Sequence, residues 1–217
     1  PPRSTLFPYT TLFRSLQTNC YILGDKVNGV AVVIDPGGDR NRIAQRLQQL
    51  DLALVAILNT HGHFDHVMDA WPLKEMLGGK IYLPPKDEYL LNDRMVGLAA
   101  VLGETGSSGG KIDRVVDESM KEGDVLTFGS IRLEVLDTPG HTPGHVSLYS
   151  PETESIFVGD TLFAGSIGRT DFPGGSFEQL IRSVKSKIFT LPGNTKVFPG
   201  HGPETTVERE KRANPFF

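Results

Sequence analysis

Short apolar runs alternate with amphipathic segments along most of the chain. Runs rich in β-branched and aromatic residues, bounded by Gly, Pro or Asn turns, predict strands. These runs occupy residues 20–23, 30–34, 52–58, 80–83, 125–128, 131–136, 146–149, 155–158 and 195–198. Apolar residues at helical spacing predict helices over 40–50, 67–77 and 177–189. Two successive halves of this kind favour an α/β protein in which two sheets pack together and helices cover the outside.

Two stretches do not follow this rhythm. Residues 84–111 show no clear period, and 92–110 suits either a lid over a site or an exposed loop. Residues 1–15 contain no acidic residue and repeat Thr-Leu-Phe at 5–7 and 11–13. Pro8 and two threonines interrupt the apolar stretch that a signal peptide needs. We therefore predict a non-native or disordered leader over 1–15, with a native strand as the alternative, and a single domain over 16–217.

Composition narrows the class of protein. A formal net charge of -4 argues against a nucleic-acid binder, whose surface would be basic. No apolar run approaches the roughly 20 residues of a membrane span. The single cysteine, Cys20, excludes an intrachain disulfide and a multi-thiolate zinc site, and it suits the core. We expect a cytoplasmic protein that acts on a small molecule, and the sequence leaves its oligomeric state open.

The six histidines are concentrated in loops. Three of them lie in Thr-His-Gly-His-Phe-Asp-His at residues 60–66, and the others are His141, His145 and His201. Each group follows a predicted strand and is flanked by Gly or Pro, so the side chains can converge at one end of a sheet. Crowded imidazoles without a metal would repel when protonated, or would need a partner for every nitrogen when neutral. Imidazole and carboxylate groups together suit zinc, iron or manganese.

Asp160 completes this chemistry. It follows the apolar run 155–158 and Gly159 directly, as a carboxylate at the end of a strand. Such a group can bridge two cations, whose positive charge lowers the pKa of the carboxyl and keeps it ionised. A Gly-Asp-Thr sequence alone is more typical of a turn or a helix cap, and its significance here comes from the histidines.

These residues resemble the metallo-β-lactamase superfamily. Its signature His-x-His-x-Asp-His stands here as His61, His63, Asp65 and His66, followed in the family's order by His145, Asp160 and His201. The segments 138–145 and 159–163 are similar to those of short, single-domain glyoxalase II-like (hydroxyacylglutathione hydrolase-like) enzymes. The resemblance implies an αββα sandwich of two mixed sheets flanked by helices.

The resemblance also implies a site for two divalent metals, with zinc expected first and iron or manganese as alternatives. His61, His63 and His145 would hold one ion. Asp65, His66 and His201 would hold the other, and Asp160 would bridge the two. His141 matches a recurrent position that we interpret as orienting its neighbours rather than binding metal.

The implied activity is hydrolysis of a thioester of the S-lactoylglutathione type. A hydroxide bridging the metals, beside Asp65 and Asp160, would attack the carbonyl, and a thiolate would leave. The substrate stays open because residues 165–175 lack the Lys and aromatic residue of glyoxalase II proper, and 16 residues follow His201 without the family's C-terminal helical domain. Arg169 either clamps a substrate carboxylate or pairs with Asp171.

Two other functions stay open. Gly-Arg-Thr-Asp at 168–171 also resembles the persulfide dioxygenase branch, in which His61-, His145- and Asp160-like positions hold one iron. A non-catalytic domain with a structural metal is the second alternative, although closed structural zinc sites are usually rich in cysteine. A true β-lactamase is disfavoured, since we expect no secretory signal.

Overall fold

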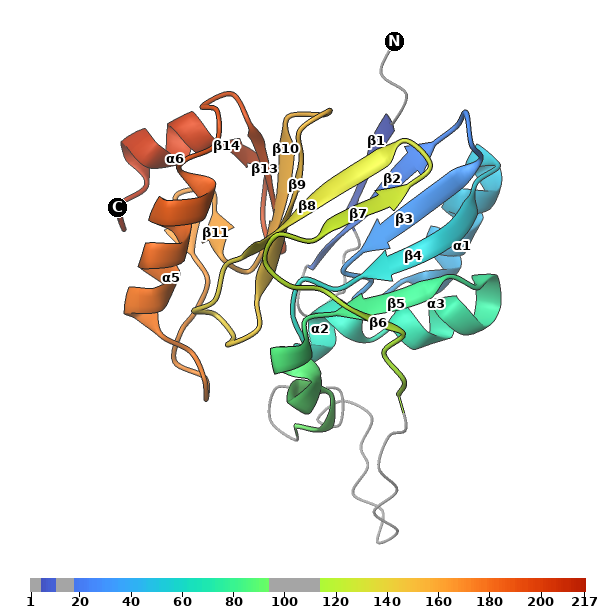
Figure 1. Ribbon diagram of the computed structural model, residues 1–217, viewed down its shortest axis with the longest axis horizontal. Helices are drawn as coiled ribbons and strands as arrows, with labels where there is room; N and C mark the ends of the chain where they lie inside the picture. Colours follow the sequence, from blue (N-terminus) through green and yellow to red (C-terminus); the bar gives the residue numbers. More distant parts are fainter. Residues whose placement is uncertain (1–4, 11–17, 94–113) are drawn as a thin grey trace, which may run out of the picture.

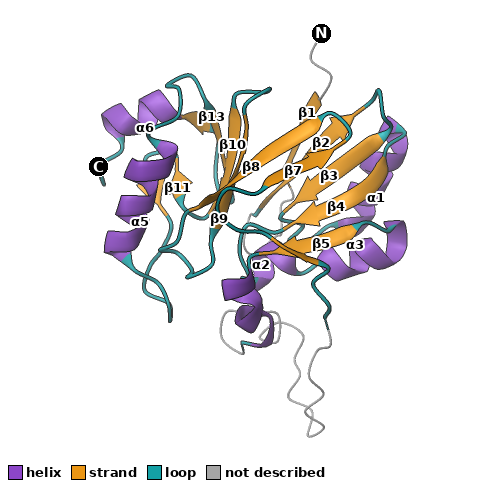
Figure 2. Cartoon of the chain, viewed as in Figure 1, coloured by secondary structure: helices purple, strands orange, loops and turns teal. Residues whose placement is uncertain are grey.

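In the computed structural model of the chain, two six-stranded sheets lie face to face and helices cover both outer surfaces (Figure 1). The structure describes residues 18–93 and 114–217 in full and residues 5–10 as backbone. Figure 2 shows the layers in order, with helices outermost and strands inside. This is the αββα sandwich that the sequence predicted.

The first sheet is mixed. Its strands follow chain order from one edge to the other, antiparallel from β1 to β3 and parallel from β3 to β6. Their bounds are β1 (Thr5–Thr10), β2 (Asn19–Asp25), β3 (Val30–Ile34), β4 (Ala53–Leu58), β5 (Lys80–Leu83) and β6 (Glu118–Ser119). Helices α1 (Arg40–Leu50) and α3 (Ala70–Leu77) cover its outer face.

The second sheet has the order β14-β13-β10-β9-β8-β7, and only β10 and β13 pair in parallel. The bounds are β7 (Val125–Phe128), β8 (Ile131–Asp137), β9 (Val146–Ser150), β10 (Ser155–Gly159), β13 (Lys196–Pro199) and β14 (Thr205–Thr206). Its outer face is covered by α5 (Phe177–Ser183), η2 (Val184–Ile188) and α6 (Val207–Ala213). A small hairpin, β11 (Leu162–Phe163) and β12 (Ser166–Ile167), follows β10.

Strand alternation explains why the sheets are buried on both faces. In β2, Cys20 and Ile22 pack toward α1 and α3, whereas Tyr21 and Leu23 pack between the sheets. Successive side chains of a strand point to opposite faces, so a continuous apolar run is what a doubly covered strand requires. The predicted core position of Cys20 agrees with its complete burial.

A buried carboxylate joins the two sheets at their hairpin turns. Asp25, at the end of β2, accepts hydrogen bonds from the backbone N–H groups of Val27 and Asn28 at 2.9 and 3.1 Å. It also accepts one from the N–H of Ser130, in the turn between β7 and β8, at 2.7 Å. The turns of both sheets are therefore fixed to one another by a single side chain.

Several helices differ from their predicted form. The helix predicted over 67–77 is divided into α2 (Phe64–Val67) and α3, because Asp69 leaves helical geometry and accepts hydrogen bonds from Arg40. The helix near 177–189 is found as α5 followed by η2. Within residues 84–111, η1 (Pro85–Asn92) was not predicted.

Some predictions fall outside the described residues. The predicted lid or loop over 92–110 does so apart from Asn92 and Asp93. Residues 5–10 are placed as β1 along β2, and the non-native or disordered character of 1–15 stays a prediction. Every helix in the part of the chain that the structure describes is too short or too polar to cross a bilayer.

Candidate metal centre

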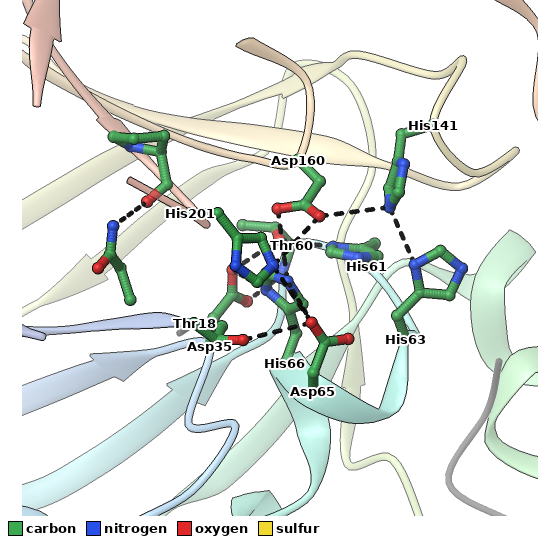
Figure 3. A network of polar contacts seen from close by, with 12 residues as sticks. Thr18, Asp35, Thr60, His61, His63, Asp65, His66, His141, Asp160 and His201 are labelled. Carbon is green, nitrogen blue, oxygen red and sulfur yellow. Dashed lines mark hydrogen bonds and ion pairs between the residues drawn. The ribbon is translucent and has the colours of Figure 1, made fainter. Parts of the chain in front are cut away.

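Histidine and aspartate side chains from both sheets meet at one end of the sandwich (Figure 3). His61 follows β4, and the chain then enters α2, which carries Asp65 and His66. The second sheet contributes loops after β8, β10 and β13, which supply His141, Asp160 and His201 respectively. The donors therefore lie in segments that directly follow strands of the two sheets, as the sequence predicted.

The first donor group consists of three histidines. One nitrogen each of His61, His63 and His141 lies within 4.8 Å of the other two. His63 Nδ1 and His141 Nε2 are 2.9 Å apart. His141 Nδ1 lies 2.7 Å from the carbonyl oxygen of Arg169, so this nitrogen must carry the proton and donate it. With Nδ1 held by this carbonyl, Nε2 of His141 points toward His63.

The second donor group consists of Asp65, His66 and His201, again with donor atoms within 4.8 Å of one another. His201 Nε2 is 3.2 Å from Asp65 Oδ2, and His66 Nε2 is 3.6 Å from the same oxygen. His66 Nδ1 lies 3.1 Å from Asp35 Oδ2. The carboxylate of Asp35 accepts that proton and leaves Nε2 directed into the centre.

Asp160 lies between the two donor groups. Its Oδ1 is 3.4 Å from His66 Nε2, while its Oδ2 is 3.6 Å from His141 Nε2 and 3.5 Å from His201 Nε2. One carboxylate thus faces nitrogens of both groups. This is the position in which a side chain can bridge two ions.

His145 does not join either group, although it was predicted as a ligand. Its Nε2 accepts a hydrogen bond from the backbone N–H of Asp160 at 3.1 Å. Its Nδ1 lies 3.1 Å from the hydroxyl oxygens of both Thr138 and Thr161. Both ring nitrogens of His145 thus have polar neighbours in the metal-free chain, one of them the backbone of Asp160, while His141 lies beside His63. The prediction that His145 binds metal and that His141 orients its neighbours stays a prediction, and the position of His141 beside His63 makes His141 the alternative ligand.

Unsatisfied polar atoms show that the centre fits a cation. His61 Nε2, His66 Nε2 and Asp160 Oδ1 are buried, and none has a hydrogen-bond partner among the described residues. One atom from each of these residues forms a further group of possible donors within 4.8 Å. Buried polar atoms without partners are costly, and a metal ion would satisfy all three at once. A set of nitrogen and oxygen donors suits zinc, iron or manganese.

The electrostatics keep the imidazoles of His61 and His63 neutral. Burial, together with the neighbouring imidazoles, lowers the pKa of His61 well below its usual value. Burial and His141 lower the pKa of His63 to about 3. A neutral imidazole offers a lone pair to a metal, so these two side chains are prepared for binding near neutral pH.

The carboxylates concentrate negative charge at the centre. Burial raises the pKa of Asp160, but the charge of His66 outweighs it and the pKa is lowered overall. Burial conversely lowers the pKa of His66, yet Asp160 and Asp65 raise it well above its usual value. In the metal-free chain a proton on His66 therefore supplies the positive charge that these carboxylates attract.

Close approaches explain two glycines. A Cβ atom on Gly159, whose φ is +45°, would lie 2.4 Å from Thr60 Oγ1 and 2.7 Å from His145 Nε2. A Cβ atom on Gly200 would lie 2.2 Å from Asp160 Oδ1. Real atoms do not approach so closely, so both positions need glycine to let the strand ends meet.

A cavity of about 450 Å³ opens beside the donors. Its lining combines ligand side chains with an apolar wall: His63, Phe64, Asp65, His141, Asp160, Phe163, Ser166, Ile167, Arg169, Phe172 and His201. Arg169 forms the ion pair with Asp171, with N···O distances of 2.8 and 2.7 Å. Its guanidinium carbon lies 3.7 Å from the centre of the Phe172 ring. The ion pair that we considered for Arg169 is thus present, while the side chain still borders the cavity.

Three supporting residues were missed by the sequence analysis. Asp35 accepts hydrogen bonds from the N–H and hydroxyl of Thr60, both at 2.7 Å. Asp35 directly follows the apolar run 30–34. The same position after an apolar strand identified Asp160. Asp87 lies in the segment without a clear period, and Asn19 directly precedes the predicted strand 20–23, so neither carried a recognisable signal.

Comparison with known proteins gives a consistent picture. The family profile described as the Metallo-beta-lactamase superfamily matches residues 14–201. The hydroxyacylglutathione hydrolase GloC of Haemophilus influenzae is 39% identical over 202 residues, which cover 93% of each chain.

Solved structures share the fold and the chain length. The crystal structure of the BLEG-1 B3 metallo-β-lactamase is 36% identical, with a TM-score of 0.85, and the match covers 98% of this chain and 99% of that one. The di-iron-bound form of TTHA1623 is 40% identical, with a TM-score of 0.79 and coverage of 97% and 100%. ETHE1 from Myxococcus xanthus is 30% identical, with a TM-score of 0.77 and coverage of 96% and 83%.

Proposed function

The chain belongs to the metallo-β-lactamase superfamily of metallo-hydrolases, and on this premise we propose that it hydrolyses small thioesters at a two-metal centre. The observation that carries the proposal is the position of Asp160. Its carboxylate lies within 3.6 Å of nitrogens from both donor groups and borders an open cavity. A site that shares one carboxylate between two sets of ligands suits a pair of ions better than a single structural one.

The proposed ligands follow the geometry. His61 and His63 hold one ion together with His145, as the sequence predicts, or with His141, the neighbour of His63. Asp65, His66 and His201 hold the other ion, and Asp160 is shared. The backbone N–H of Asp160 also contacts His145. Zinc is our first choice, and the two irons of the related TTHA1623 make iron the principal alternative, with manganese also compatible with the donors.

Residues that line the cavity would each have a separate role in hydrolysis. A bound metal pair would lower the pKa of a water between the ions and polarise the thioester carbonyl. Phe64, Phe163 and Phe172 provide an apolar wall that holds the substrate and limits access of bulk water. Arg169 borders the same cavity and can attract an anionic end of the substrate. Water and the thioester yield a carboxylic acid and a thiol.

The proposed substrate is a hydroxyacyl thioester of the S-lactoylglutathione type, in the cytoplasm. Its support is the 39% identity to a hydroxyacylglutathione hydrolase across 93% of both chains. A thioester also suits a metal centre because its thiolate leaves readily, so hydrolysis by water needs no serine or cysteine nucleophile. Cys20 is fully buried in the core and is unsuited to that role.

Metal analysis beside a thioester assay tests the proposal. We expect two metals per chain by mass spectrometry under replete conditions, and hydrolysis of S-lactoylglutathione that is lost in chelator and restored by zinc or iron. Fewer than two metals per chain would contradict the two-metal centre. Unfolding on metal removal, with no activity on esters, thioesters or lactones, would instead favour a structural metal.

A second candidate is persulfide oxidation at one iron. The likeness to ETHE1 at 30% identity and the Gly-Arg-Thr-Asp sequence at 168–171 favour it. Oxygen consumption with glutathione persulfide, at one iron per chain, would establish this activity over hydrolysis. Since the BLEG-1 enzyme is also similar, a β-lactam substrate belongs in the same assay panel.

A further inference from the structure

We propose that Asp87 and Asn19 are positioning residues that each hold one donor group, so that the two metal sites can be weakened separately. The inference rests on the proposed two-metal function. It concerns two buried polar side chains that border no substrate cavity and contact no proposed metal ligand through their own polar atoms. Each instead forms hydrogen bonds to the backbone or side chains beside the ligands.

Asp87 joins the two loops that carry the three-histidine group. It lies on η1 and is completely buried. Its Oδ2 accepts hydrogen bonds from Thr142 Oγ1 at 2.6 Å and from the N–H of Gly62 at 3.2 Å, and its Oδ1 accepts one from the N–H of Gly144 at 2.6 Å. Gly62 stands between His61 and His63 in the chain, and Thr142 directly follows His141. One carboxylate therefore ties the loop of His61 and His63 to the loop that carries His141 and His145.

The glycines in these loops fit this role for Asp87. A Cβ atom on Gly62 would lie 2.6 Å from the carbonyl oxygen of Asp87, and one on Gly144 would lie 2.6 Å from its Oδ1. Both loops thus approach Asp87 more closely than any other residue type would allow. The glycine between the first two histidines of the signature is needed here for contact with Asp87.

Asn19 holds the loop that carries His201. It is buried at the start of β2. Its Nδ2 donates to the carbonyl oxygens of Pro199 at 3.0 Å and Gly202 at 2.8 Å, and its backbone N–H donates to that of Gly200 at 2.7 Å. These three carbonyls flank His201 on both sides. The loop that brings His201 to Asp65 is therefore fixed from the first sheet.

The two positioning residues act on different loops. The side-chain bonds of Asp87 described above reach residues 62, 142 and 144, whereas those of Asn19 reach residues 199 and 202. Loss of either bond set should loosen one donor group and leave the other in place. Partners of ligand-bearing segments typically change metal affinity by about 10- to 100-fold when they are removed.

The experiment measures the affinity of each of the two zinc ions by competition with a chromophoric chelator. In Asp87→Asn we expect one of the two zinc affinities to fall at least about tenfold while the other changes by less than about twofold. Asn19→Ala should weaken the opposite ion. The backgrounds His63→Ala and His201→Ala assign the sites, because Asp87→Asn should add little to the first and its full effect to the second.

Asp25→Asn is the matched control, since Asp25 is also a buried carboxylate that accepts several backbone N–H groups but lies at the hairpin turns. We expect it to lower the unfolding temperature of the metal-free protein while leaving both zinc affinities within about twofold of the wild type. Asp87→Asn keeps the size of the side chain, and its metal-free unfolding temperature shows that the variant folds.

Several outcomes would overturn the inference. If Asp87→Asn lowered the affinity for both zinc ions equally, its effect would be a general loss of structure. The same conclusion would follow if the zinc affinities of Asp25→Asn fell in proportion to its unfolding temperature. Unchanged affinities in both positioning variants would also contradict it. A wild-type chain that binds a single zinc would refute the two-metal function itself, a result visible before any variant is measured.

Discussion

The backbone carbonyl of Arg169 accepts the Nδ1 proton of His141 at 2.7 Å. Arg169 therefore makes two contributions. Its side chain borders the cavity, and its backbone carbonyl fixes the ring of His141 beside His63. The carbonyl sets the tautomer of His141 and directs Nε2 toward His63. Because this contact does not involve the guanidinium, the side chain of Arg169 can be changed without removing it.

Variants of Arg169 and Asp171 separate a substrate clamp from a purely structural ion pair. If Arg169 attracts an anionic thioester, Arg169→Ala should raise KM about tenfold, the equivalent of about 1.4 kcal/mol, at unchanged metal content. Asp171→Asn should lower KM, because it frees the guanidinium from its bidentate partner. Steady-state kinetics with charged and neutral thioesters provide the measurement. Unchanged KM and kcat in Arg169→Ala would show that Arg169 only supports its loop.

Substitution of His141 and of His145 tests which of the two binds metal. His141→Ala removes a donor from the three-histidine group, so we expect it to bind one zinc per chain and to lose activity more than about 100-fold. His145→Ala removes the acceptor of the Asp160 N–H, so it should retain two zinc ions with activity lowered about 10- to 100-fold. Metal analysis of the two purified variants distinguishes them. Loss of one zinc in His145→Ala, with both retained in His141→Ala, would confirm the prediction from the sequence that His145 is the ligand.

An added methyl group at Gly200 should displace the shared carboxylate. Its Cβ would lie 2.2 Å from Asp160 Oδ1 and 2.6 Å from His66 Cε1, so Gly200→Ala must move Asp160 or the loop of His201. We expect weaker binding of both ions and a lower kcat. Gly193→Ala is the control, because its Cβ would meet only the side chain of Glu208, at 3.3 Å or more. Zinc titration that cannot tell the two variants apart would contradict the bridging position of Asp160.

Asp25 should make the fold sensitive to acid. Burial raises the pKa of Asp25, but hydrogen bonds from Asn28 and Ser130 outweigh it and lower the pKa well below its usual value. A lowered pKa in the folded state stabilises the protein above the pKa of the unfolded chain, near 3.9, and this stability is lost as the pH falls below it. At pH 7 we expect Asp25→Asn to lower the free energy of unfolding by about 1–3 kcal/mol.

The comparison with Asp25→Asn isolates that contribution. Urea unfolding of the metal-free proteins at pH 7, 4 and 3 should show the difference between wild type and variant shrinking as the pH falls. Other carboxyl groups contribute equally to both proteins and cancel. A difference that stays constant over this range would show that the charge of Asp25 has no part in holding the two turns together.

The sequence predicted the parts of the fold that local patterns determine. Val30–Ile34 was predicted with its observed bounds, because a β-branched run is limited there by Asn28-Gly29 on one side and Pro36 on the other. The two-residue strands β6, β11, β12 and β14 are too short to show alternation. Helix α6 also escaped prediction, since only Val207 and Glu210 are buried on it and its apolar stripe is narrow.

The features that the sequence did not predict depend on contacts between residues that are distant in the chain. His141 and His145 both stand after Thr-Pro-Gly, so their local sequences do not tell which ring enters the centre. In the structure their contacts distinguish them, because His141 contacts the carbonyl of Arg169 and His145 contacts the N–H of Asp160. The cluster at residues 60–66 was recognised because its donors are close neighbours in the chain.

The donors come from both sheets, so the packing between the sheets affects the spacing of the metal ligands. Tyr21 of one sheet packs against Phe157 and Phe198 of the other, with ring centres 5.2 and 5.4 Å apart. These aromatic rings act as spacers between the two halves. A smaller side chain at Phe157 would allow the two sheets to move closer together. A substitution in the buried core should therefore change the distance between the two metal ions.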